Sequence, residues 1–148
     1  RLARGCRNVL LPGWVGAAEI WTLLRMSTVG LAPYRNRENF IRNLPNKPVE
    51  YLSAGLPVVS SLKGVLQDLL DTHGCGVTYE EGDAAALASF LVSLHDRPER
   101  LRTMSEKAKA LFDERFVAEK VYNEMVDYLE QVAALSKAGI RGPRANRV

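Results

Sequence analysis

The residues best suited to do chemistry lie in one short stretch, residues 43–59. Asn46 is a favoured helix N-cap, and Pro48 suits a first turn because its missing N–H costs nothing there. Lys47 would place a cation at the positive end of the helix dipole, which is unfavourable unless an anion docks on the amides there. Glu50 lies four residues beyond Asn46, about 6 Å along the axis at roughly 1.5 Å per residue. A carboxylate at that distance from a bound diphosphate could accept hydrogen bonds from the two vicinal hydroxyls of a ribose.

Each of these residues also has a purely structural interpretation. A glutamate such as Glu50 is favourable early in a helix without any ligand, and Lys47 can be a solvated surface residue. Gly55-Leu56-Pro57 can be a helix stop followed by a turn into a strand. His73 and His95 fall at predicted helix ends, where a cation suits the dipole, and they form no Ser-His-Asp order. The sequence has no Asp-x-Asp pair that could hold a metal-bridged diphosphate.

The elements that must position this stretch alternate between strands and helices. Continuous apolar runs predict strands at residues 9–12, 29–32, 57–60 and 74–79. Apolar spacing and caps predict helices at residues 17–27, 46–54, 64–72, 83–95, 98–115 and 117–135. Such strands are typical of a parallel sheet that is buried on both faces, and open parallel sheets bind ligands beyond the carboxyl ends of their strands. The long loop at residues 34–45 lies at such an end and is typical of a functional loop.

Composition narrows the class of protein. The chain has 148 residues, 47% of them hydrophobic and 25% charged, which suits one globular α/β domain. Its net charge of +3 comes with no interleaved basic and aromatic pattern, so no nucleic-acid partner is expected. Cys6 and Cys75 lie far apart without metal-ligand spacing, which favours a reducing compartment. No apolar run approaches ~20 residues, so no membrane-spanning segment is expected.

Residues 45–59 resemble the donor-site helix of family 4 glycosyltransferases, which have the GT-B fold, and are most similar to the bacterial surface-polysaccharide branch. Other pieces agree in order. Residues 8–15 resemble the strand and turn beside the nucleobase pocket, and residues 29–34 resemble the strand before the donor loop. The resemblance covers about residues 8–130. It implies an α/β, Rossmann-like doubly wound parallel sheet with helices on both faces, forming part of a GT-B C-terminal domain.

The resemblance also assigns roles to individual residues. Glu50 would bind the ribose hydroxyls, and amides near Leu44, Pro45, Asn46 and Lys47 would hold the diphosphate, with Lys47 adding charge. Arg42 replaces the second acid that family members commonly carry, so it would contact phosphate or be solvated. The remaining donor-binding candidates are Gly13, Trp14, Val15, Tyr34 and Gly64. Trp14 and Trp21 are expected to be packing residues, and Trp14 can also border the base. No catalytic residue, metal or cofactor is assigned, and the donor would be a UDP- or GDP-sugar.

The resemblance finally predicts how the chain is organised. Residues 1–136 would form a truncated C-terminal nucleotide-sugar-binding domain, and residues 137–148 a basic, disordered tail. Because the chain does not begin with methionine, we interpret it as a piece of a longer, cytoplasmic enzyme that can lie at the inner face of the membrane. The expected partners are the missing N-terminal GT-B domain, a nucleotide sugar and a glycan or lipid-linked acceptor. The fragment alone would be inactive, and the apolar face of its last helix predicts a homodimer.

Two other classes remain open from the sequence. One is a GT-B relative that transfers no sugar to an acceptor, such as a nucleotide-sugar epimerase, which would need acidic and histidine residues around the sugar. The other is a doubly wound interaction module that binds no nucleotide.

Overall fold

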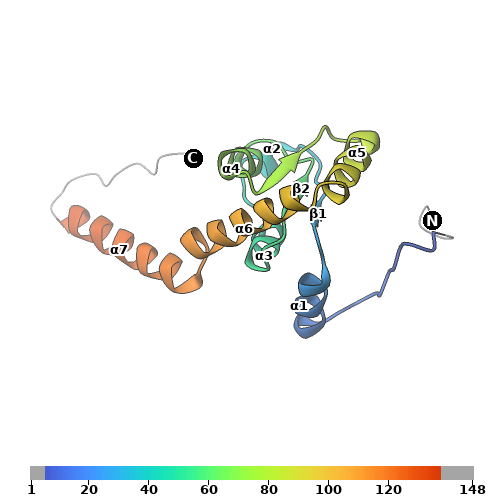
Figure 1. The fold of residues 1–148 in the computed structure, drawn as a ribbon. Coiled ribbons are helices and arrows are strands. Elements are labelled where there is room, and N and C mark those ends of the chain that lie inside the picture. Colours follow the sequence, from blue (N-terminus) through green and yellow to red (C-terminus); the bar gives the residue numbers. More distant parts are fainter. Residues whose placement is uncertain (1–5, 138–148) are drawn as a thin grey trace.

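The fold is built on a small parallel sheet (Figure 1). The computed structural model describes residues 6–137. Strands β1 (Gly30–Ala32), β2 (Val58–Ser60) and β3 (Gly76–Thr78) pair in the order β1-β2-β3, with Leu31 opposite Val59 and Val59 opposite Val77. The α/β class and the parallel open sheet predicted from the sequence are therefore confirmed.

The helices of the described residues are α1 (Ala17–Met26), α2 (Glu38–Ile41), α3 (Asn46–Ser53), α4 (Val65–His73), α5 (Ala84–His95), α6 (Pro98–Arg115) and α7 (Ala118–Lys137). Helix α3 packs on β1, β2 and α6, while α4 packs on β3 and α6, and α5 packs on α6. Helix α7 extends away from the sheet, and α1 lies below β1 in the view shown (Figure 1).

The core lies around the central strand. All three residues of β2 are buried, as are Leu66 and Leu70 on the inner side of α4. The one hydroxyl in this strand is satisfied, because Ser60 Oγ donates to the Ala32 carbonyl oxygen at 2.8 Å and accepts from the Leu62 amide at 3.0 Å. The central strand thus has the burial on both faces that its continuous apolar run predicts.

Most helix boundaries agree with the sequence. Asp83, the first residue of the helix predicted at residues 83–95, caps α5, and its carboxylate accepts from the Ala86 amide at 2.8 Å. Gly74 ends α4 in the left-handed conformation, directly after His73. His95 is likewise the last residue of α5.

Three local predictions are wrong. Residues 9–12 form no strand, and Leu10 and Leu11 are 88% and 79% exposed, because no strand lies beside them within residues 6–137. The loop at residues 34–45 contains the short helix α2. Asn46 is the first residue of α3 rather than its cap, and the extended residue before it is Pro45.

Two further predictions concern the ends of the chain and the membrane. Of the predicted tail, residues 138–148 lie outside the described residues, and Lys137 is the last residue of α7. Within the described part of the chain, none of the helices has the length and apolar character needed to cross a membrane.

Candidate functional site

The amino end of α3 is open. Its cap, Pro45, makes no side-chain capping bond, and neither Pro45 nor Pro48 has an N–H. The first-turn amides are therefore those of Asn46 and Lys47, and no acceptor among residues 6–137 hydrogen bonds to them. A pocket of about 360 Å³ lies at this end, lined by Asn39, Phe40, Asn43, Leu44, Pro45 and Asn46. The helix end is thus not plugged by other parts of the described chain.

A second pocket, the β1–α3 groove, runs along the side of the same helix. It has a volume of about 370 Å³ and is lined by residues of α1, β1 and α3 together with Val15, Ser27, Val29 and Leu56. Lys47 and Glu50 both line it, and both are exposed. The carboxylate of Glu50 therefore faces a pocket and not the apolar core. The structure brings together three of the residues singled out from the sequence, Val15, Lys47 and Glu50, at this groove.

Two tyrosines lie in the electrostatic field of Glu50. The ring of Tyr51 covers Gly30, where any Cβ atom would collide with it, and its hydroxyl donates to the Leu31 carbonyl oxygen at 3.1 Å. The pKa of Tyr51 is raised by burial first, then by the nearby Tyr34 phenol and by the charge of Glu50. The pKa of Tyr34 is raised by burial and then by Glu50. Both phenols therefore stay protonated at neutral pH and can donate hydrogen bonds.

The other predicted site residues are dispersed. Arg42 is paired with Glu38 at 2.6 Å on the exposed side of α2 and lines neither pocket beside α3. Tyr34 stacks on Phe40 with ring centroids 5.6 Å apart and lines a separate pocket at the carboxyl ends of the strands. Gly13, with φ +80°, belongs to neither pocket beside α3.

The expectation that Trp14 and Trp21 pack in the interior is wrong. Trp14 is 99% exposed and Trp21 is 49% exposed. The reason is the same as for residues 9–12, since no element within residues 6–137 covers this part of the chain. Trp14 also lines neither pocket beside α3.

Gly64 has a structural role that explains its position after β2. It precedes α4 with φ +75°, and a Cβ atom there would lie on the carbonyl oxygen of Ile41. The end of α2 therefore packs directly against the start of α4. This close approach fixes one side of the segment that leads into α3.

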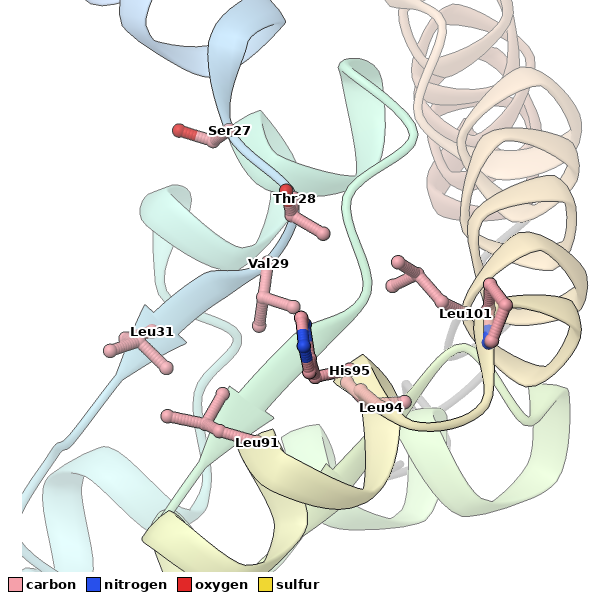
Figure 2. A pocket seen from close by; sticks show the side chains of 9 residues that line it. Ser27, Thr28, Val29, Leu31, Leu91, Leu94, His95 and Leu101 are labelled. Carbon is pink, nitrogen blue, oxygen red and sulfur yellow. The ribbon is translucent and has the colours of Figure 1, made fainter.

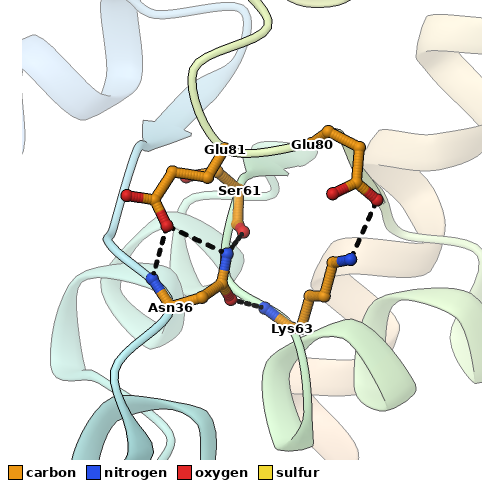
Figure 3. A network of polar contacts seen from close by, with 5 residues as sticks. All are labelled: Asn36, Ser61, Lys63, Glu80 and Glu81. Carbon is orange, nitrogen blue, oxygen red and sulfur yellow. Dashed lines mark hydrogen bonds and ion pairs between the residues drawn. The ribbon is translucent and has the colours of Figure 1, made fainter.

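Sequence reasoning missed a polar network at the carboxyl ends of the strands (Figure 3). Its centre is Asn36, which bonds to Ser61, Lys63 and Glu81. These partners are 25, 27 and 45 residues away along the chain, so no local spacing could reveal them.

A larger pocket of about 640 Å³ lies between β1, α5 and the start of α6 (Figure 2). Its lining is mostly apolar, including Val29, Leu91 and Leu94, with His95 at the end of α5. The described residues contain no group of three or more His, Cys, Asp or Glu side chains that could hold a metal ion.

The fold is thus an open parallel α/β domain in which a helix amino end borders one pocket and a carboxylate of the same helix borders another. Residues 1–97 match the family described as glycosyl transferases, group 1, and the chain belongs to this family. It is also 28% identical over 126 residues to the amylovoran biosynthesis glycosyltransferase AmsK of Erwinia amylovora, covering 84% of this chain and 31% of that protein. The chain spans less than a third of this relative. No solved structure matches it. These findings confirm the resemblance to GT-B glycosyltransferases.

Proposed function

We propose that this chain binds the nucleoside diphosphate part of a UDP- or GDP-sugar as one half of a glycosyltransferase. The observation that carries the proposal is the open amino end of α3 with Glu50 one turn deeper, beside the β1–α3 groove. Family membership supports a glycosyltransferase, and this geometry supports the donor-binding role.

Two positions on α3 would bind different parts of the nucleotide. The amides of Asn46 and Lys47 and the helix dipole attract the diphosphate, and the Lys47 ammonium adds positive charge. The Glu50 carboxylate accepts from the ribose diol, which orients the nucleotide along the groove. The same amides stabilise the charge that develops on the departing diphosphate.

We further propose that the whole enzyme is a cytoplasmic, family 4 glycosyltransferase. This enzyme transfers a hexose or an amino sugar to a glycan or lipid-linked acceptor in surface polysaccharide synthesis. The transfer is retaining and uses neither a metal nor a cofactor. Residues 1–136 form the donor-binding half, and an N-terminal GT-B domain supplies the acceptor side, so the fragment alone transfers no sugar. The relative's name supports the polysaccharide role. No observation on residues 6–137 favours an epimerase or a nucleotide-free module instead.

Calorimetric titration of the chain with UDP and with GDP tests the donor site. We expect at least one nucleotide to bind, and Glu50→Ala to weaken it about 10-fold or more, since a hydrogen bond to a charged group contributes about 1.5–3 kcal/mol. Glu106→Ala is the matched control, because Glu106 is an exposed glutamate on α6 whose side chain is 70% accessible.

The control variant is expected to bind as the unmodified chain does. Binding of neither nucleotide would refute the proposal. Equal affinities for the Glu50→Ala and unmodified chains would remove Glu50 from the site.

A further inference from the structure

The segment between β1 and α3 must hold a defined shape if the amino end of α3 is to meet a diphosphate. This segment, residues 33–45, contains little regular structure apart from α2. Two contacts hold this segment. Asn36 hydrogen bonds to other loops near its start, and Ile41 lies close to Gly64 near its end.

Asn36 uses both polar groups of its side chain (Figure 3). Its Nδ2 donates to the Ser61 carbonyl oxygen at 2.8 Å and to Glu81 Oε2 at 3.4 Å. Its Oδ1 accepts from the Lys63 amide at 2.8 Å. Its backbone N–H donates to the same Glu81 oxygen at 2.9 Å.

These contacts join the loops that follow all three strands. Asn36 follows β1, Ser61 and Lys63 follow β2, and Glu81 follows β3. A further bond, from Ser61 Oγ to the Tyr34 carbonyl oxygen at 2.7 Å, strengthens the connection between the first two loops. Only an amide side chain offers donors and an acceptor together in this arrangement, because a carboxylate would lose both donors.

We propose that Asn36 and Glu81 are positioning residues for the donor site, forming what we term the Asn36 clamp with Ser61 and Lys63. The clamp sets the path of residues 37–45 and so the placement of the α3 amino end. Neither residue lines a pocket beside α3, so the clamp acts through the loop and not by contact with the nucleotide. This inference rests on the proposed donor-binding function.

An isosteric substitution tests the clamp. Asn36→Asp removes the two Nδ2 donors and places a second carboxylate against Glu81, while an acceptor for the Lys63 amide remains. Hydrogen exchange followed by mass spectrometry should show amides of residues 37–47 exchanging about 10-fold faster, with the amides of β2 unchanged. The affinity for UDP, or for GDP if only that nucleotide binds, should fall about 10-fold.

Glu80→Gln is the matched control. Glu80 adjoins Glu81, but its carboxylate pairs with the Lys63 ammonium at 2.9 Å and makes no bond to Asn36. The control should change neither loop exchange nor nucleotide affinity.

A second substitution that restores a hydrogen bond between residues 36 and 81 distinguishes loss of this bond from a general loss of structure. Adding Glu81→Gln to Asn36→Asp gives an amide that can donate to the new carboxylate, so loop exchange and affinity should both return part of the way. Unchanged exchange in Asn36→Asp would overturn the clamp. Faster exchange with unaltered affinity would overturn its role in donor binding.

Failure of the proposed function gives a different result. If the unmodified chain bound neither UDP nor GDP, the donor-binding role of the clamp would fall with the proposed function. The exchange data alone would then decide whether Asn36 holds the loop.

Discussion

At the scale of single residues, the charge of Glu50 acts on two phenols. Burial is the larger cause of the raised pKa of Tyr34 and of Tyr51, and Glu50 adds to both. For a tyrosine whose pKa is raised on folding from 10.0, the stabilising contribution is fully present below pH 10. It is lost as the pH rises through the folded-state pKa. The fold is therefore expected to weaken in alkali as these phenols ionise.

Glu50→Gln should lower the pKa of both tyrosines part of the way towards 10.0, because burial remains when the charge is removed. Spectrophotometric titration of tyrosinate absorbance measures this. Glu106→Gln serves as the control and should titrate as the unmodified chain does. Superimposable curves for Glu50→Gln and the unmodified chain would show that Glu50 does not face the phenols.

The candidate site was predictable only where it depends on local geometry. Lys47 and Glu50 reach the same groove because they are three residues apart on one helix, a relation that the sequence contains directly. Asn36 and Glu81 are 45 residues apart, so their contact depends on the order of the strands. Arg42 illustrates a third case. Its partner, Glu38, lies four residues earlier at the start of α2, and this local pairing leaves Arg42 away from the pockets beside α3.

At the scale of elements, helices were predicted more reliably than strands. The signals that begin α5 and α6 are local, namely Asp83 as a cap and Pro98 in a first turn. A strand exists only beside a partner, and residues 9–12 have none within residues 6–137. Residues 9–12 are an apolar run, but composition alone does not show whether another strand pairs with it.

The contact between α2 and α4 gives a prediction at this scale. Gly64→Ala should be more destabilising than Gly82→Ala, although both glycines have a positive φ, +75° and +86°. The left-handed strain, about 1–3 kcal/mol, is common to both substitutions. Only at Gly64 would the new Cβ atom also overlap a backbone carbonyl, that of Ile41, whereas nothing lies within 4 Å at Gly82.

Urea denaturation of the two variants measures the difference. We expect Gly64→Ala to lose at least about 1 kcal/mol more free energy of unfolding than Gly82→Ala, because overpacking alone costs about that much or more. Equal losses of unfolding free energy in the two variants would mean that the end of α2 does not pack closely against the start of α4.

At the scale of the whole molecule, apolar surface is concentrated away from the sheet. It lies on the chain before and within α1, where Trp14 and Met26 are 99% and 79% exposed, and along α7. Exposed apolar patches of this kind are typical of surfaces that contact another body.

Helix α7 is the clearest of these surfaces because its exposed apolar residues share one face. The exposed apolar side chains on this face follow helical spacing and are 40–61% exposed, namely Val121, Tyr122, Met125, Val126, Tyr128 and Leu129. The helix is attached to α6 near its start by a bond from Lys120 Nζ to the Asp113 carbonyl oxygen at 2.6 Å. Beyond that point it extends away from the sheet (Figure 1).

The predicted homodimer follows from this face. Burying apolar surface contributes about 25 cal/mol per Å², so two copies should associate along α7 as concentration rises. Met125→Lys combined with Leu129→Lys should raise the dissociation constant about 10-fold or more in sedimentation equilibrium, since lysine keeps the helix propensity while introducing charge. Asn123→Lys with Gln131→Lys adds lysines at polar positions of the same helix and should weaken association far less. A chain that stays monomeric at every concentration, or two double variants that weaken association equally, would exclude this face as the dimer contact.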